Sequence, residues 1–275
     1  MAMIKLSSSR LWKSVLTSSK CSIHTYDALD FLPSSVNWVT AGAVPQIKNQ
    51  GHTNACWAFA AVSCVEALNF VATSNLVTLS EQEIYSCERF NQCGRGNPGY
   101  AFNHIVTRDG IASDQDLPFT GQFGDCYPMM PRVASIDGYG IVPHNDELAL
   151  KWAVAHSPVA AVIEADESFC MNSTGIITHQ SRVGYLNHCV TIVGYNSIYG
   201  LDYWLIRNSW GKFWGNKGYG VMPRNIRVKS GCCNMTAAAY YPIKKGFIPP
   251  FPTVIVPRIL HNRCCHCRVC FPINT

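Results

Sequence analysis

The sequence predicts an α+β protein built from two packed lobes, because the residue pattern changes midway along the chain. The segment after Cys56, "WAFAAVSCVEALNFVA", is apolar on almost every side, as a helix in the middle of a fold is. From about residue 158, short β-branched or aromatic runs separated by Gly, Asn and Pro favour strands. A helix-rich half followed by a strand-rich half is typical of an α+β fold.

Each further element is predicted from a local signal. A second helix is expected from Ser80, because Glu83 follows three residues later in "SEQEIYSC" and the two form a capping box. Shorter helices are expected at 98–106 and 146–155. The strands are expected in "VAAVIEA", "HCVTIVGY", "YWLIRNSW" and "GYGVM".

The two ends of the chain differ from its middle. Residues 1–31 are basic and Ser-rich without a clear apolar stretch, so we expect a leader there. Residues 244–275 begin as a Pro-rich linker and end in "CCHCRVC". In that tail Cys267, Cys270 and His266 offer only one pair of cysteines at zinc-site spacing, where two ligand pairs are usual. A zinc-binding tail is therefore the weaker alternative, and we predict no metal site.

Composition argues against several classes of function. No run of about 18 apolar residues is present, so no membrane span is predicted. The net charge is +5, but residues 244–275 hold five Lys or Arg and no acid, which leaves no basic stripe for nucleic acid elsewhere. Fourteen cysteines, with sequons at Asn172 and Asn234, suggest an oxidising compartment and several disulfides.

Cys56 stands where a polar turn, "QGHTNA", meets the apolar helix. A cysteine at a helix N-terminus faces unpaired backbone N–H groups and the positive end of the helix dipole, which favours its thiolate form. The dipole alone supplies at most about 2 kcal/mol, so full activation needs a cationic partner such as histidine.

His188 is the best candidate for that partner, because it opens a predicted strand that can aim its side chain rigidly. Asn208 follows twenty residues later, and the next strand of an antiparallel pair would bring it beside His188. An Asn amide oxygen can accept the imidazole N–H and fix the tautomer, and Trp210 can cover that bond from water.

With these residues in place, the sequence resembles the papain-type cysteine peptidases, especially the plant bromelain-like members, over residues 32–243. The motifs are "LPSSVNWVTAGAVPQIKNQG", "LSEQEIYSC", "NHCVTIVGY", "YWLIRNSWGKFWGNKGYG" and "AAAYYPI". His188 and Asn208 lie 132 and 152 residues after Cys56, close to the family spacing of about 130–150. The resemblance implies a helical left lobe to about residue 140, with a central buried helix, and an antiparallel, β-barrel-like right lobe from about residue 141.

The resemblance also implies a function, that of a cysteine-type endopeptidase working through a covalent acyl-enzyme without cofactor or metal. It makes Cys56 the nucleophile, His188 the general base and then acid, Asn208 the orienting residue, and Gln50 the oxyanion-hole donor. The substrate-binding residues implied or predicted are Gly96, Pro98, Asn187 and Trp210. The alternative is a catalytically impaired homologue that acts as a binding module.

Several positions depart from the family pattern. Thr53 replaces a cysteine, which leaves Cys93 without its usual partner, and Cys64 is one candidate to replace it. Asn54 replaces a turn glycine, at a cost of about 1–2 kcal/mol if that turn needs positive φ. Arg95 replaces a glycine beside Gly96; we expect it to be solvated, the alternative being that it contacts substrate.

The family disulfides are only partly preserved. The resemblance implies a Cys87–Cys126 pair. Cys233 keeps its family position, but its usual partner is replaced in the region of residues 181–182, so Cys170 or Cys232 is the candidate partner.

The resemblance further implies polypeptide substrates, cystatin-type inhibitors as partners, a monomer, and a location in the vacuole, the lysosome or outside the cell. Residues 1–31 are then a leader or the remnant of a truncated propeptide.

Overall fold

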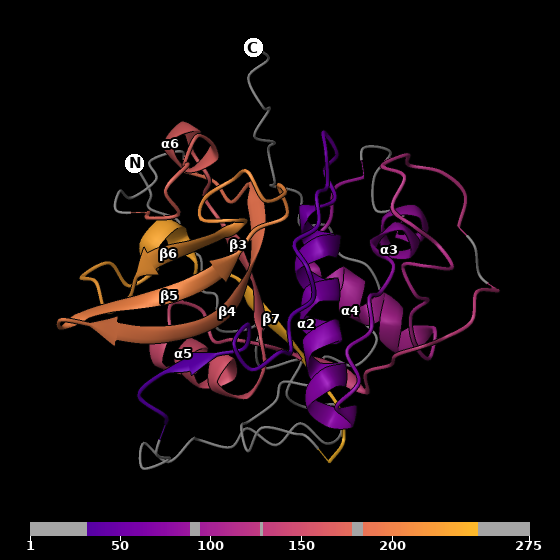
Figure 1. Cartoon of the computed structure of the whole chain (residues 1–275), viewed down its shortest axis with the longest axis horizontal. Helices are drawn as coiled ribbons and strands as arrows, with labels where there is room; N and C mark the ends of the chain where they lie inside the picture. Colours follow the sequence, from indigo (N-terminus) through magenta and orange to yellow (C-terminus); the bar gives the residue numbers. More distant parts are fainter. Residues whose placement is uncertain (1–31, 89–93, 127–128, 178–183, 247–275) are drawn as a thin grey trace, which may run out of the picture.

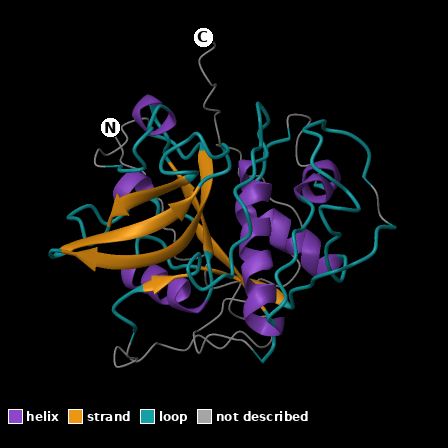
Figure 2. Cartoon of the chain, viewed as in Figure 1, coloured by secondary structure: helices purple, strands orange, loops and turns teal. Residues whose placement is uncertain are grey.

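The computed structural model describes residues 32–88, 94–126, 129–177 and 184–246 of the chain. A helical part lies beside a part built mainly of strands, and helix α2 runs along the boundary between them (Figures 1 and 2). We call these two parts the helical lobe and the β lobe. The α+β class predicted from the sequence is confirmed. Residues 1–31 and the "CCHCRVC" tail lie outside the described residues, so our interpretations of these two segments stay predictions.

Helix α2, Cys56–Thr73, is the central element of the fold. Its residues from Trp57 to Asn69 are all buried, as the nearly continuous apolar sequence predicts. It packs against helix α4 on one side and strands β3, β4 and β7 on the other. Within the described residues it is the one helix long and apolar enough to cross a membrane, and 72% of that window is buried inside the protein, as in a core helix.

The other helices begin at polar caps. Helices α3 (Glu81–Cys87), α4 (Pro98–Thr107), α5 (Glu147–His156) and α6 (Glu167–Cys170) begin after Ser80, Asn97, Asp146 and Asp166, whose side chains each accept a backbone N–H. The predicted capping box at Ser80 is half wrong. Ser80 Oγ accepts the Glu83 N–H at 3.0 Å, but the Ser80 N–H donates to the Ala112 carbonyl. The Glu83 carboxylate instead accepts the Ala112 N–H at 2.9 Å.

The described strands form one antiparallel sheet of seven strands in the order β2-β7-β3-β4-β5-β6, with β1 paired to β4. Their bounds are Val36–Asn37 (β1), Gly138–Ile141 (β2), Val159–Ile163 (β3), His188–Ile198 (β4), Leu201–Arg207 (β5), Tyr219–Pro223 (β6) and Ala239–Ile243 (β7). The sheet is open rather than a closed barrel, because β2 and β6 lie at the two ends of this strand order. Strand β4 lies inside the sheet between β3 and β5, and it is one of the three strands that pack against α2.

The disulfide implied between Cys87 and Cys126 is present, with an S–S distance of 2.01 Å. Cys64 is a buried free thiol. Neither Cys170 nor Cys232 forms a disulfide with Cys233. The adjacent sulfurs of Cys232 and Cys233 lie 3.9 Å apart. Cys93 lies outside the described residues.

Candidate active site

The two lobes are joined beside the start of α2. The backbone of residues 48–50, which precedes Cys56, pairs with residues 209–211, which follow strand β5. Gln50 N–H donates to the Ser209 carbonyl at 2.8 Å, and Asn49 forms an isolated bridge with Trp210. This crossing places the turn before Cys56 against the loop that carries Asn208 and Trp210.

His188 and Asn208 meet through the register of strands β4 and β5. Thr191 lies opposite Arg207 in the antiparallel pair, so the residues before Thr191 run alongside those after Arg207. His188 Nε2 lies 2.8 Å from Asn208 Oδ1. Because Asn208 Oδ1 also accepts the Ser209 N–H at 2.8 Å, it is the amide oxygen that faces the ring. Nε2 therefore carries a hydrogen, and Nδ1 remains for proton exchange.

The His188–Asn208 bond is shielded from water. Both side chains are buried, each 3% exposed. The Trp210 ring stacks on the His188 ring with a centroid distance of 4.3 Å and an interplanar angle of 27°. The predicted cover by Trp210 is thus present as a ring stack.

Cys56 is the first residue of α2. The preceding residue, Ala55, gives no side-chain cap, and the first turn contains no acidic residue. The pKa of the Cys56 thiol lies well below its ordinary value. A hydrogen bond from the Cys189 thiol lowers it most, burial opposes that effect, and a hydrogen bond and the charge of His188 lower it further.

Gln50 lies beside this thiol and is held from both ends of its amide. Its Oε1 accepts the Ser209 hydroxyl at 2.6 Å, and its Nε2 donates to the Thr53 carbonyl at 2.8 Å. An amide nitrogen carries two hydrogens, so one N–H remains after the bond to Thr53.

A cleft surrounds these groups. It is lined by Gln50, Thr53, Asn54, Cys56, Trp57, Arg95, Gly96, Asn187, His188 and Trp210. Asn208 lies behind His188 and does not line it, and Pro98 is buried at the first position of α4. The structure therefore brings together all the predicted site residues except Pro98, with Asn208 in contact through His188.

Comparison with known proteins agrees with this arrangement. Residues 32–243 match the family described as papain family cysteine protease. The chain belongs to the papain family. It is 42% identical over 236 residues to the oryzain beta chain of Oryza sativa subsp. japonica, covering 84% of this chain and 50% of that protein. It is also 42% identical over 232 residues to cysteine protease 1 of the same plant, covering 81% and 47%.

Solved structures of the family share the fold. The bromelain protease from Ananas comosus, solved in complex with an inhibitor, matches with a TM-score of 0.73 and 34% identity, covering 78% of this chain and 100% of that one. The recombinant stem bromelain precursor matches with a TM-score of 0.77 and 34% identity, covering 81% and 75%. This papain-family chain spans about half the length of the first curated relatives it matches.

The departures from the papain-family pattern fit the turn before Cys56. Asn54 does not have positive φ; in this turn positive φ falls on Gly51, so the expected cost at Asn54 does not arise. Thr53 Oγ1 donates to the Gln50 carbonyl at 2.7 Å and so stabilises the turn locally. Arg95 lines the cleft and is half-buried, so its side chain is partly rather than fully exposed to solvent.

Two predicted cleft residues prove to be fixed by packing. A Cβ on Gly96 would lie 2.6 Å from the Trp57 ring, so the backbone at this position lies flat on the indole. Asn187 accepts the Ala165 N–H and donates to the Ala165 carbonyl, both at 2.7 Å. The Asn187 amide is therefore fixed by the backbone that follows strand β3, and Asn187 also lines the cleft.

Sequence reasoning missed three aromatic residues and one cysteine at this site. Trp57 supports Gly96, while Phe169 and Trp214 pack with Trp210 around the His188 ring. The cysteine is Cys189, which touches Cys56. The two tryptophans were visible as apolar residues in quoted motifs, but nothing local indicated which partners they meet.

Proposed function

We propose that this chain is a cysteine-type endopeptidase that cleaves polypeptides through an acyl-enzyme. The observation that carries the proposal is the cleft that holds Cys56, at the start of α2, together with His188, whose ring is oriented by the Asn208 amide oxygen. His188 also lowers the pKa of the Cys56 thiol. A thiolate paired with an imidazolium is a nucleophile with its proton donor in place. The whole protein's substrates, its cystatin-type partners, its monomeric state and its vacuolar or secreted location are part of this proposal by family membership.

Each of these residues has a defined role in the proposed reaction. The Cys56 thiolate attacks the peptide carbonyl carbon, and the negative charge develops on the carbonyl oxygen. The remaining Gln50 Nε2–H and the Cys56 backbone N–H stabilise that charge. His188 then protonates the leaving amine, and water, deprotonated by the same ring, hydrolyses the thioester while Asn208 keeps the ring oriented. Gly96, Asn187 and Trp210 line the path of the substrate.

Labelling with an electrophilic peptide epoxide tests the proposal directly. We expect covalent labelling of the native protein and at least about 100-fold less in Cys56→Ala, because only a thiolate in the cleft opens the epoxide rapidly. Cys64→Ala is the matched control, since Cys64 lies on the same helix with 0% exposure and should not affect labelling. Labelling that is absent from the native protein, or equal in the Cys56→Ala protein, would refute the endopeptidase assignment and favour a binding module.

Replacing Gln50 tests the proposed oxyanion donor. Gln50→Ala is expected to lower kcat by about 10²- to 10³-fold with little change in KM, because the lost N–H acts on charge that exists only in the transition state. Steady-state cleavage of a fluorogenic peptide measures this. Alkylation of Cys56 by iodoacetamide forms no oxyanion and should be unchanged. The exposed Gln46 gives the control Gln46→Ala. Loss of cleavage and alkylation together would show that Gln50 only holds the turn.

A further inference from the structure

Directly after His188, strand β4 carries a cysteine that the proposed reaction does not use. Successive side chains of a strand point to opposite faces. Val190 belongs to the core of the β lobe, whereas Cys189 belongs to the core of the helical lobe, against α2. Cys189 is 1% exposed, and Cys56 packs against the same cluster.

The fit of β4 against α2 brings Cys189 level with Cys56. Two residues further along β4, Thr191 Oγ1 donates to the Ala60 carbonyl at 3.3 Å. Ala60 lies four residues after Cys56, about 6 Å along the helix. Two residues of strand cover about 6.7 Å. Because these two distances are nearly equal, the contact between Thr191 and Ala60 places Cys189 beside Cys56.

Cys189 also acts on Cys56 electrostatically. Its thiol lowers the pKa of the Cys56 thiol more than any other group does, and its backbone lowers that pKa further. Neither cysteine forms a disulfide in the structure. A reactive thiolate and a protonated thiol in contact form a pair that a two-electron oxidant can join.

We propose that Cys189 is a resolving thiol, which closes a reversible disulfide with Cys56 when a hydroperoxide oxidises the nucleophile. Here, the Cys56 thiolate attacks the peroxide, an S–O bond forms, and the O–O bond breaks. The departing hydroxide takes a proton from His188 and leaves as water. The Cys189 sulfur then attacks the Cys56 sulfenic acid, an S–S bond forms, and the hydroxyl group leaves with the Cys189 proton as a second water. Cys56 is oxidised by two electrons in the first step, and in the disulfide that two-electron oxidation is shared equally by the two sulfur atoms.

Burial divides the two roles between the cysteines. Cys56 lines the cleft, where a small peroxide reaches it, whereas Cys189 lies beneath it and is oxidised only through Cys56. Without a resolving thiol, the sulfenic acid meets a second peroxide and becomes a sulfinic acid, which ordinary thiols do not reduce. The disulfide therefore replaces an irreversible oxidation of Cys56 by a reversible inactivation of the enzyme.

Other described cysteines are less suited to this role. Cys64 lies two turns further along α2, and burial raises the pKa of its thiol well above the ordinary value. Cys170, Cys232 and Cys233 belong to the β lobe, on elements other than β4. Cys64→Ala is thus a matched control for removal of a buried thiol from the same core.

The test compares native protein, Cys189→Ala, Cys189→Ser and Cys64→Ala after exposure to hydrogen peroxide and then dithiothreitol. Peptide mapping should find a Cys56–Cys189 cross-link in the native and Cys64→Ala proteins. In both Cys189 variants Cys56 should instead gain two oxygen atoms. After dithiothreitol, the fraction of Cys56 that iodoacetamide alkylates should be at least about tenfold higher in the native protein than in Cys189→Ala. Thermal unfolding checks that each variant is folded.

Two results would overturn the proposal: no Cys56–Cys189 peptide in oxidised native protein, or equal recovery of the Cys56 thiol in the native protein and both folded Cys189 variants. These readouts follow the state of a sulfur atom and require no peptide cleavage. The disulfide is therefore tested even if the chain fails as an endopeptidase, and a failed disulfide leaves the endopeptidase proposal intact.

Discussion

Replacing His188 by alanine is expected to lower kcat/KM for a fluorogenic peptide substrate by about 10⁴- to 10⁶-fold, the range seen when one member of a nucleophile–base pair is removed. The variant loses two functions at once. Cys56 loses a bond and a positive charge that favour its thiolate, and the leaving amine loses its proton donor. Asn208 then has no ring to orient.

The pH dependence of Cys56 alkylation separates these two losses. His188 lowers the pKa of Cys56, so native protein holds the reactive thiolate at pH values well below the ordinary range for a thiol. In His188→Ala the pKa of Cys56 rises. Alkylation by iodoacetamide should therefore be slow near about pH 6 and increase toward about pH 9, whereas the native rate should change little over that interval.

His52→Ala is the control for this experiment, because His52 is exposed and lies only four residues before Cys56. It should leave both cleavage and the alkylation profile unchanged. If His188→Ala retained the native alkylation profile, Cys56 and His188 would not form the ion pair proposed here. If it retained cleavage, the histidine would not be the base.

The positions of Cys56, His188 and Asn208 were predictable from local patterns, whereas the role of Gln50 came from the family resemblance alone. The polar turn and apolar run place Cys56 at a helix start, and the strand pattern places His188 at a strand start. An antiparallel neighbour then brings Asn208 alongside, as the register of β4 and β5 does. That Cys56 in one lobe meets His188 in the other was inferred from the family spacing, because no local pattern indicates contacts between lobes.

Contacts between distant segments were not predictable in this way. The Glu83 pattern indicated a capping box, yet the Glu83 carboxylate pairs with His104 and Arg132, which are far away in sequence. These charged partners outcompete the Ser80 N–H, since charge-assisted bonds are stronger than neutral ones. Cys189 escaped notice because strand alternation does not say which face meets a helix.

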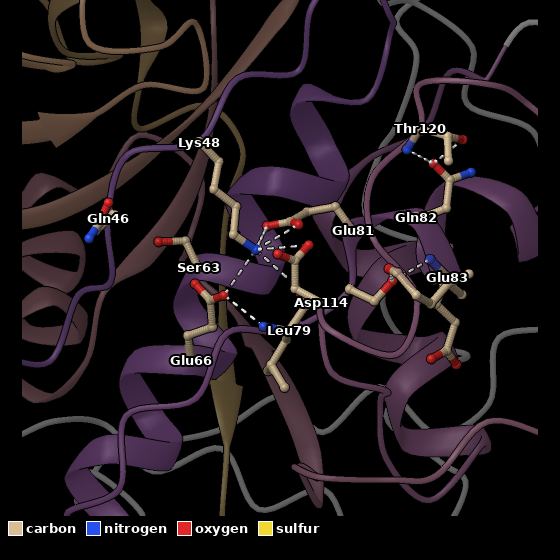
Figure 3. Close-up of polar contacts among 12 residues, drawn as sticks. Gln46, Lys48, Ser63, Glu66, Leu79, Glu81, Gln82, Glu83, Asp114 and Thr120 are labelled. Carbon is tan, nitrogen blue, oxygen red and sulfur yellow. Dashed lines mark hydrogen bonds and ion pairs between the residues drawn. The ribbon is translucent and has the colours of Figure 1, made fainter.

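A buried ionic cluster under the active site provides the second large expected effect. Lys48 Nζ lies 2.8 Å from Glu81 Oε2, 3.4 Å from Glu66 Oε1 and 3.8 Å from Asp114 Oδ1, and it also donates to the Leu79 carbonyl (Figure 3). The side chains of Glu66 and Glu81 are 0% and 2% exposed. Arg207 Nη1 lies 3.9 Å from Glu66 Oε2, so Glu66 faces a second cation, whereas Glu81 depends on Lys48.

Lys48→Met is expected to lower the free energy of unfolding by about 3–5 kcal/mol, because it leaves the buried Glu81 carboxylate without its counter-charge and removes one of the two cations beside Glu66. For a domain of this size that corresponds to a fall in Tm of about 6–20 °C. Calorimetry or circular dichroism measures it. The exposed Lys229 gives the control Lys229→Met, which should change the free energy of unfolding by less than about 0.5 kcal/mol.

The effect of Lys48→Met should depend on pH in a defined direction. Burial raises the pKa of Glu81 from 4.5 to about 7, and the charge of Lys48 opposes that rise. Between these values the folded protein holds a proton that the unfolded chain has lost, so stability falls as pH increases. Without Lys48 the pKa rises further, and the fall extends to higher pH. The deficit of the variant should therefore be greatest above about pH 7 and shrink toward about pH 4.5. A deficit that is constant across this range would mean that Lys48 stabilises the fold through the packing of its stem rather than through its charge.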